Sequence, residues 1–541
     1  MRRIAVLLYA LVALTAILTT GLRPTAAQAV TAPTPSHPGT MSVVADCPGI
    51  NPIHAAMTGT GKVLMVAGTG YNLDNAERDG QGNLKVTQAW IYDPAAPSVC
   101  PTEIPLPQAD DLFCSGHTHL PDGRLLFFGG TGRYGEPGSY PGSPNYYTGI
   151  RAAYAFDDAT NTFQKLPDMN AARWYGQGTA DANGNIIVVG GVDDTGRETN
   201  VNERFNAATS TWTKLPVPSW QFPMYAGMVL LPSGQFAYTG TYFLTRFARQ
   251  PMTWNPANNA NVGIPGLPYL DCRDQGSTVF VYPKVFVIGG GCARGVTGTV
   301  SVMDVSKSPL RFTAAPYLGY AAQHICATPL PDRSVYVSGG SDHNRAPRYE
   351  ARRLGTGASA WTKLANPTIA RGYHSTCVPL LDGRVLMMGT NWTQGSAETR
   401  LEVYSPWYTQ AGLVRPRIKT LDRTTVALGG TINATYEVAT ITGAILQSLP
   451  SSTHAAPEGR AVPLTVVAGG FGKTAVKVPT SGAIVPPGKY MLSLIDWRGA
   501  PTISRIITVT KPGVAAPVQA RPVAASVGVG APSAAEPCCC C

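Results

Sequence analysis

Charged residues are scarce in this chain of 541 residues, since Asp, Glu, Lys and Arg together make up only 14%. So low a charge argues against a helical bundle or a coiled coil, whose exposed faces are rich in charged side chains. The 58 glycines and 46 prolines suit instead many short strands joined by turns. With 44% apolar residues the composition is that of a folded protein, and the length allows several cores.

A cluster of basic residues is also missing, although the formal net charge is +10. The lysines and arginines are scattered along the chain, and no RNA- or DNA-binding motif accompanies them. We therefore expect no nucleic-acid partner, and we attribute the charge to solubility and to attraction for anionic polymers. We also expect a monomer.

Long hydrophobic runs are absent except for one at the N-terminus. Arg2 and Arg3 precede an apolar run from residue 4 to about residue 22, and residues 27–29 (Ala-Gln-Ala) offer a cleavage site with small residues. This order predicts a signal peptide over residues 1–29 and a secreted or cell-surface protein. An uncleaved membrane anchor is the alternative, because the run approaches the roughly 20 residues that span a bilayer.

Cysteines are present, but their number in the body of the chain is odd. Four of the 11 cysteines form a run at residues 538–541, and the rest lie between Cys47 and Cys377. Some of the latter should pair in an exported protein, and we expect the disulfides Cys47–Cys100 and Cys272–Cys292. The odd count leaves at least one cysteine for another role.

A turn, a strand-forming segment and a glycine recur together seven times along the chain. Residues 121–130 (Pro-Asp-Gly-Arg-Leu-Leu-Phe-Phe-Gly-Gly) are an example, and the last four intervals are about 50 residues each. This period is typical of kelch-type propellers. Unrelated hairpins would not be spaced so evenly, although Asp-Gly turns are common. We predict an all-β fold that begins with a seven-bladed, kelch-like β-propeller over residues 30–410.

The repeat stops after about residue 407, and short apolar segments then alternate with turn residues until residue 509. This pattern predicts an antiparallel, immunoglobulin-like β-sandwich domain over residues 411–511. From residue 512 to residue 541 the chain is rich in Pro, Ala and Val with almost no charge. We expect that segment to be a disordered tail.

One position of the repeat collects side chains that can do chemistry. The innermost strand of each propeller blade lines the central channel, so equivalent positions lie at similar depth around it. Eight residues before five of the turns stand Cys114, Tyr175, Tyr225, His324 and His374. Cys114 and Tyr175 fall in consecutive blades, and we expect them to be in contact. Taken singly, such residues are usually part of a core, but together around one axis they suit copper better than calcium or magnesium.

Four segments resemble the galactose oxidase and glyoxal oxidase family of copper-radical oxidases. They are residues 111–116 (Asp-Leu-Phe-Cys-Ser-Gly), 172–175 (Ala-Arg-Trp-Tyr), 371–375 (Arg-Gly-Tyr-His-Ser) and 452–464, which begins Ser-Thr-His. The resemblance extends over nearly all of the chain, from about residue 49 to residue 509. It implies the same order of domains that the repeat predicts.

The resemblance also implies a cofactor and a site. Cys114 would form a thioether with the ring of Tyr175, which carries a radical, and copper would be bound by Tyr175, Tyr373, His374 and His454. A loop of the C-terminal domain would enter the propeller axis to deliver His454. Judged by its own sequence context, a histidine in a Ser/Thr/Ala loop would be an ordinary surface residue. Tyr373 and His374 can face one metal only at a strand mouth or bulge, because neighbours on a regular strand point to opposite faces.

By the same resemblance the protein would be a secreted copper-dependent oxidase. It would oxidise a primary alcohol, an aldehyde or a carbohydrate and reduce O2 to H2O2. Tyr175, Tyr373 and Cys114 would be catalytic, with Tyr373 as the general base, and Trp174 and His324 would lie at the substrate pocket. The alternative is a catalytically silent propeller that binds glycans or partner proteins at the cell surface, since a fold alone does not define a function.

Departures from the galactose-oxidising members make galactose a doubtful substrate. Those members carry an extra N-terminal sugar-binding domain, whereas here the propeller pattern starts almost directly after the apolar run. They also have a tryptophan after the glycine pair, where this chain has residues 192–194 (Val-Asp-Asp). The arginine expected shortly before His324 is missing. Trp174, which resembles the glyoxal oxidases, is the expected substitute for the missing tryptophan.

Overall fold

The computed structural model of the protein describes residues 37–47, 51–68, 87–105, 110–136, 138–243, 249–292, 294–390, 398–454 and 456–513. The predicted signal peptide and nearly all of the predicted tail lie outside these residues. Within them, no helix is long and apolar enough to cross a membrane. The described residues form β-strands with two short 3-10 helices, η2 (Leu270–Cys272) and η3 (Trp407–Thr409). The predicted all-β class is confirmed.

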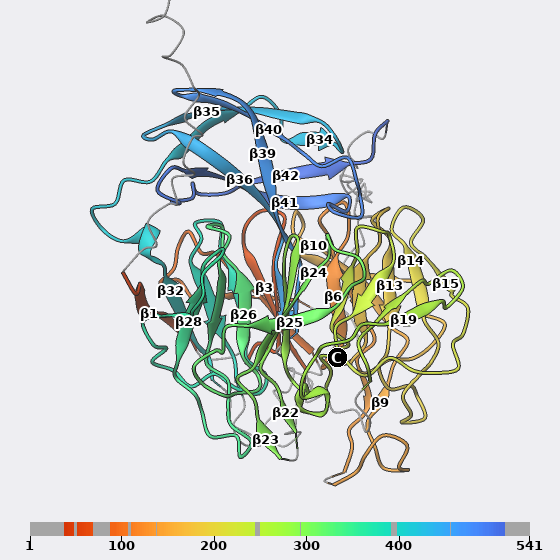
Figure 1. The fold of residues 1–541 in the computed structure, drawn as a ribbon. Coiled ribbons are helices and arrows are strands. Elements are labelled where there is room, and N and C mark those ends of the chain that lie inside the picture. Colours follow the sequence, from red (N-terminus) through yellow and green to blue (C-terminus); the bar gives the residue numbers. More distant parts are fainter. Residues whose placement is uncertain are drawn as a thin grey trace, which may run out of the picture.

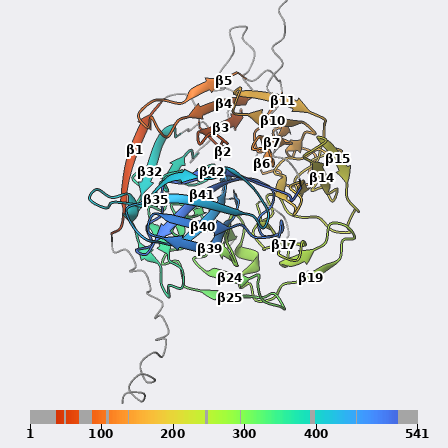
Figure 2. The same ribbon diagram turned by 90° about the horizontal axis from the view of Figure 1, so that it is seen from above.

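Antiparallel meanders follow one another in chain order around a ring, which Figure 2 shows from above. Each meander runs outward from an inner strand, and such a ring is a β-propeller, as predicted. Several meanders are complete sheets of their own: β11-β10-β7-β6, with β6 (Gly116–His119), β7 (Leu125–Phe128), β10 (Ala153–Asp157) and β11 (Thr162–Leu166); β12 (Gln177–Ala180) to β15 (Thr211–Lys214), with β13 (Ile186–Val189) and β14 (Glu203–Asn206); β16 (Met228–Leu230) to β19 (Asn261–Gly263), with β17 (Phe236–Tyr238) and β18 (Met252–Trp254); and β26 (Cys326–Pro329) to β29 (Thr362–Lys363), with β27 (Val335–Ser338) and β28 (Ala351–Leu354).

Strands from the two ends of the propeller sequence close the ring. β1 (Thr40–Asp46) pairs antiparallel with β32 (Arg400–Ser405) at the outer edge of a meander that also contains β31 (Val385–Met388) and β30 (Thr376–Pro379). The chain therefore returns to its start. Two small hairpins lie outside the meanders: β8 (Thr131–Arg133) with β9 (Thr148–Gly149), and β22 (Gly291–Cys292) with β23 (Gly295–Val296).

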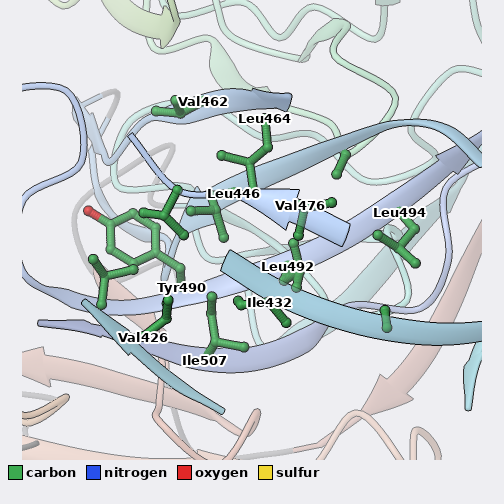
Figure 3. Packing of buried hydrophobic residues seen from close by; sticks show 14 of the residues in the cluster. Val426, Ile432, Leu446, Val462, Leu464, Val476, Tyr490, Leu492, Leu494 and Ile507 are labelled. Atoms are coloured by element: carbon green, nitrogen blue, oxygen red, sulfur yellow. The ribbon is translucent and has the colours of Figure 1, made fainter. Parts of the chain in front are cut away.

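The C-terminal residues form a β-sandwich that lies on one face of the propeller (blue in Figure 1). Its core contains Ile432, Val476 and Leu492, which are fully buried (Figure 3), because apolar residues alternate along its strands. The strands are β33 (Arg417–Leu421), β34 (Thr425–Ala427), β35 (Thr431–Glu437), β36 (Ile441–Ser448), β39 (Ala461–Gly470), β40 (Lys473–Lys477), β41 (Gly488–Asp496) and β42 (Arg505–Thr510).

Two propeller sheets are continuous with strands of the C-terminal domain. The meander β20 (Ser277–Val281), β21 (Lys284–Ile288), β24 (Val300–Asp304) and β25 (Phe312–Ala315) joins β39 through a bridge between Val281 and Ala461. The hairpin of β37 (Ser451–Thr453) and β38 (Ala456–Glu458) extends the sheet of β2 (His54–Met57), β3 (Val63–Gly68), β4 (Thr87–Tyr92) and β5 (Thr102–Ile104). This hairpin also contacts the inner strands β6, β20, β26 and β30. It therefore occupies the central channel of the propeller.

Three disulfides lie among the described residues of the propeller. The predicted pairs Cys47–Cys100 and Cys272–Cys292 are confirmed. A third, Cys326–Cys377, joins the inner strands β26 and β30 and was not predicted. These two cysteines stand at nearly equivalent places of consecutive repeats, and this spacing is the signal that could have revealed the pair. Cys114 is buried and forms no disulfide. This agrees with the odd number of cysteines, which leaves at least one without a disulfide partner.

Candidate metal centre at the propeller axis

The inner positions that the repeat singles out share an unusual backbone conformation. Cys114, Tyr175, Tyr225, His324 and His374 have φ values of 58°, 64°, 39°, 58° and 63°. A left-handed conformation costs a residue with a side chain about 1–2 kcal/mol, and such outliers cluster at functional sites. Each of the five stands two or three residues before an inner strand. Because each residue lies in a turn, the direction of its side chain is not set by the alternating pattern of the strand that follows it.

Backbone hydrogen bonds connect these turns around the axis. The Tyr175 amide donates to the Cys114 carbonyl at 2.9 Å, and the Tyr225 amide donates to the Tyr175 carbonyl at 2.9 Å. The His324 amide likewise donates to Gln275, which also has a positive φ. The Cys114 thiol and the Tyr175 side chain are hydrogen-bonding neighbours. The predicted contact between Cys114 and Tyr175 is therefore present, and it is set by the register between neighbouring blades.

Phenol, imidazole and thiol groups converge inside this ring. The Tyr175 hydroxyl oxygen lies 2.7 Å from the Tyr373 hydroxyl oxygen and 2.8 Å from His454 Nε2. Cys114 Sγ lies 3.8 Å from the same His454 nitrogen. The potential ligand atoms of Cys114, His374 and His454 are all within 4.8 Å of one another. The structure thus brings together the cross-link pair and the ligands that the resemblance implied.

A turn lets the adjacent Tyr373 and His374 face the same point. Its geometry is fixed by the Ser375 amide, which donates to the Gly372 carbonyl at 3.0 Å. Thr390 Oγ1 accepts from the Gly372 amide and donates to the Tyr373 carbonyl, each at 3.1 Å. The two rings are stacked with centroids 3.8 Å apart. They lie before β30 rather than on it, so strand alternation does not separate them.

His454 comes from the C-terminal domain, at the tip of the β37–β38 hairpin. Thr453 Oγ1 donates to the Ile53 carbonyl at 2.9 Å and lies 2.7 Å from His454 Nδ1. Because a hydroxyl has a single proton, Thr453 must accept the Nδ1 proton of His454. The lone pair of Nε2 then points toward Tyr175 and the site, which is the tautomer that a metal requires.

Burial favours the neutral forms of the titratable groups. It holds the pKa of His454 well below its usual value, with His374 and His54 adding to the effect. The pKa of the Cys114 thiol is raised by burial. Burial and nearby Arg345 lower the pKa of His324 to about 3. Neutral imidazoles are the form that binds metal ions.

Trp174 covers the ring of Tyr175. Their ring centroids are 4.1 Å apart, and the other side of Trp174 stacks in parallel on Tyr147 at 4.3 Å. Trp174 is only 1% exposed. The predicted pocket residue is therefore buried against the Tyr175 ring, with an angle of 67° between the ring planes, and is shielded in turn by Tyr147, which sequence reasoning did not single out.

His324 and Arg345 lie beside the ring of Tyr373. The His324 ring centroid is 5.3 Å from that of Tyr373, and His324 Nδ1 is 3.0 Å from Ser341 Oγ. The guanidinium carbon of Arg345 lies 5.5 Å from the Tyr373 ring centroid, and Arg345 is exposed. Sequence reasoning missed this arginine because it looked only before His324. The loop after β27 supplies it instead.

The fold and these side chains together define a class of protein. It is a kelch-type propeller whose axis gathers two imidazoles, two phenols and a thiol in one buried site. Nitrogen, oxygen and soft sulfur donors suit copper rather than a hard cation.

Comparisons with known proteins agree with this class. Galactose oxidase of Gibberella zeae is 23% identical over 90% of this chain and 72% of its own length. The aldehyde oxidase GLOX of Vitis pseudoreticulata is also 23% identical, over 86% of this chain and 96% of its own length. Residues 415–509 match the galactose oxidase-like early set domain, and residues 173–216 match the kelch motif.

A solved structure shares the whole architecture. It is a fungal alcohol oxidase of the AA5 family in complex with copper, and it is similar with a TM-score of 0.72 and 21% identity. The match covers 87% of this chain and 99% of the other. The predicted resemblance to the galactose oxidase and glyoxal oxidase family is thus confirmed. The relatives support the predicted enzyme class, a copper-dependent oxidase.

Proposed function

We propose that this protein is a copper-radical oxidase that oxidises a primary alcohol or an aldehyde and reduces O2 to hydrogen peroxide. The observation that carries the proposal is the approach of the Tyr175 hydroxyl to 2.7 Å from the Tyr373 hydroxyl and to 2.8 Å from His454 Nε2, beside His374 and Cys114. An alcohol loses two hydrogens to become an aldehyde, and O2 takes them up as H2O2. An aldehyde would react as its hydrate, which loses two hydrogens in the same way to become a carboxylic acid. The named oxidases among the similar proteins support this reaction type.

Tyr175, Tyr373, His374 and His454 would hold the copper ion. When bound, copper supplies a one-electron redox centre next to a tyrosine. The neutral imidazoles and the tautomer of His454, fixed by Thr453, fit this role. The three ligand-bearing segments come from different blades and from the sandwich, so the folded chain prepares the site.

Cys114 and Tyr175 would become joined by a thioether. The thiol and the tyrosine ring would each lose one hydrogen, and O2 would accept both. The bond would lower the energy of a radical on Tyr175, and Trp174 would protect that radical because it covers the ring and excludes water.

In the reaction, Tyr373 would accept the proton of the substrate hydroxyl as general base. The Tyr175 radical would then take a hydrogen atom from the adjacent carbon, and the one-electron redox centre that bound copper supplies would be the acceptor for the remaining electron. The 2.7 Å between the two hydroxyl oxygens places both acceptors beside one substrate group. His324 and Arg345 would bind the polar part of the substrate at the outer side of Tyr373.

The proposal includes seven blades and secretion. The seven repeats support the blade count. Four meanders are separate sheets, and three more are formed by β2–β5, by β20–β25 and by β30–β32 with β1, once the strands of the C-terminal domain that extend two of them are left out. A signal peptide over residues 1–29 would export the protein. Sequencing the N-terminus of protein recovered from the medium tests that step.

Mass spectrometry of the copper-loaded protein tests the central claim. Protein made without copper is given Cu(II) in air and digested. A peptide with Cys114 joined to the peptide with Tyr175, lighter by two hydrogens, is expected, together with peroxide release from glyoxal, methylglyoxal or galactose. Bound copper without that cross-link and without peroxide would instead favour a catalytically silent, glycan-binding propeller.

A further inference from the structure

Two buried histidines lie beside the proposed centre without belonging to it. His54 begins β2 and His117 is in β6, and their rings meet edge to face with centroids 5.1 Å apart. His54 is 1% exposed and His117 is 4% exposed. The His54 ring centroid is also 6.5 Å from that of His454. His54 therefore neighbours both His117 and an imidazole of the centre.

The ring nitrogens of this pair lack ordinary hydrogen bonds. None of the four nitrogens has a hydrogen-bond partner among the described residues. The backbone carbonyls of Leu112 and Ala55 act on His54 and His117 and raise their pKa values against the larger effect of burial, but neither contact has the geometry of a full hydrogen bond. An unsatisfied buried polar group costs about 1–3 kcal/mol. Leucine or phenylalanine here would avoid that cost.

The surroundings of the pair are apolar. Leu64, Val66 and Leu112 belong to the core cluster between these two blades, and Phe127 stacks in parallel on His117 at 5.3 Å. The charged or titratable groups that act on the pair are other histidines, and no carboxylate is among them. Burial lowers the pKa of His117 to about 3. Both imidazoles are neutral and have a lone pair to offer.

We propose that His54 and His117 bind a Cu(I) ion, at a second site through which copper reaches the main centre. Two neutral imidazoles in an apolar pocket suit a soft monovalent ion, whereas Zn²⁺ takes four ligands and hard cations require carboxylates. This inference rests on the proposed function in taking copper as the metal and the proposed main centre as its destination. The ion would pass from the pair to His454, the nearest imidazole of the centre.

A cavity on the sandwich side begins next to the pair, at His119. His119 is two residues after His117 on β6, so the two side chains lie on the same face of the strand. His119 also lines a cavity of about 120 Å³ between the inner strands and the β37–β38 hairpin, with Gln177, Glu458 and Lys489. An ion that enters this cavity would meet His119 before the pair.

Anaerobic Cu(I) titration against bicinchoninate tests the site separately from the main centre. The background variant is Cys114→Ser/His374→Ala/His454→Ala with the four cysteines at residues 538–541 also replaced by serine. It cannot assemble the proposed main centre, and it removes the terminal thiols, which would otherwise bind Cu(I) themselves. It should still bind one Cu(I), and adding His54→Leu/His117→Leu should abolish that binding. Adding His343→Leu instead, at an exposed histidine, should change nothing. No binding by the first variant, or binding unaffected by the leucine pair, overturns the proposal.

A conservative substitution and spectroscopy distinguish a loss of metal binding from a loss of folding. His117→Met, whose thioether also binds Cu(I), should retain the ion in the same background, which a purely structural role of His117 would not predict. In the chain that lacks only the terminal thiols, copper analysis should find two Cu(I) per protein, and X-ray absorption should show one of them with two nitrogen ligands. A single retained ion would contradict the second site, while the thioether test of the main centre would be unaffected.

Discussion

The hydroxyl oxygens of Tyr175 and Tyr373 lie 2.7 Å apart, although 198 positions separate the two residues in the chain. Each is fixed by its own turn before an inner strand, and the closed ring sets the distance between the turns. Neither residue can move toward the other by a local adjustment. Their spacing is therefore a property of the whole propeller, and the chemistry proposed for the pair depends on ring closure by β1 and β32.

Replacing Tyr373 by phenylalanine tests its role as the base. Tyr373→Phe removes the proton acceptor but keeps the ring that stacks on His374. We expect kcat to fall by about 10²–10⁴-fold, the usual contribution of a positioned base. Steady-state peroxide assays and their pH profile measure this effect. Tyr349→Phe, at a tyrosine that is 41% exposed, is the control and should keep full activity. A Tyr373→Phe enzyme of parental kcat would exclude proton transfer to this residue.

Replacing Cys114 by serine tests the thioether. The Cys114 side chain is buried, and serine is similar to it in size. The variant Cys114→Ser should therefore fold and should still bind copper through the four proposed ligands. The cross-linked peptide and the oxidase activity should both be lost. Circular dichroism, copper analysis and peroxide release separate the three properties. Activity equal to that of the parent would show that the radical needs no cross-link.

The repeat in the sequence was sufficient to predict the propeller and the ring of inner positions. Counting eight residues back from each turn placed Cys114 and Tyr175 at equivalent positions of consecutive blades, although the interval between their turns is longer than the later intervals of about 50 residues. The positive φ shared by these residues gave no sequence signal, since none of them is glycine. His454 could be assigned only by resemblance, because nothing local distinguishes a hairpin tip in a channel from one in solvent.

Residues that reach the site from loops escaped the sequence analysis. Arg345 and Tyr147 approach it from segments between the strands of the repeat, where no periodic position marks them. The His54–His117 pair escaped for another reason. His54 and His117 lie on inner strands of different blades, and each one alone is indistinguishable from a core histidine. Only the fold places their rings 5.1 Å apart.

Arg345 offers a test of substrate binding. Its exposed guanidinium lies over the ring of Tyr373, where it can donate to a carbonyl or carboxylate oxygen of a substrate. Hydrogen bonds to a charged group contribute about 1.5–3 kcal/mol, so Arg345→Ala should raise KM for glyoxal-type substrates by roughly 10–100-fold. We expect a much smaller change in kcat. Arg311→Ala, at another exposed arginine, should leave both constants as they are. An unchanged KM in Arg345→Ala would place the substrate elsewhere.

The carboxyl of Glu458 makes stability depend on pH. It lies on the hairpin that delivers His454, accepts from Gln177 Nε2 at 2.7 Å, and has a pKa raised by burial to about 8. Between its ordinary pKa and 8, the folded protein holds a proton that the unfolded chain has lost, so stability falls as pH rises through this range. Glu458→Gln keeps an acceptor for Gln177 but cannot ionise. Its melting temperature should exceed that of the parent by more at pH 8 than at pH 5, as measured by differential scanning calorimetry. Glu437→Gln, at a half-exposed strand position of the sandwich, is the control and should show no such pH-dependent gain. Equal differences at both pH values would mean that Glu458 is already ionised in the folded protein.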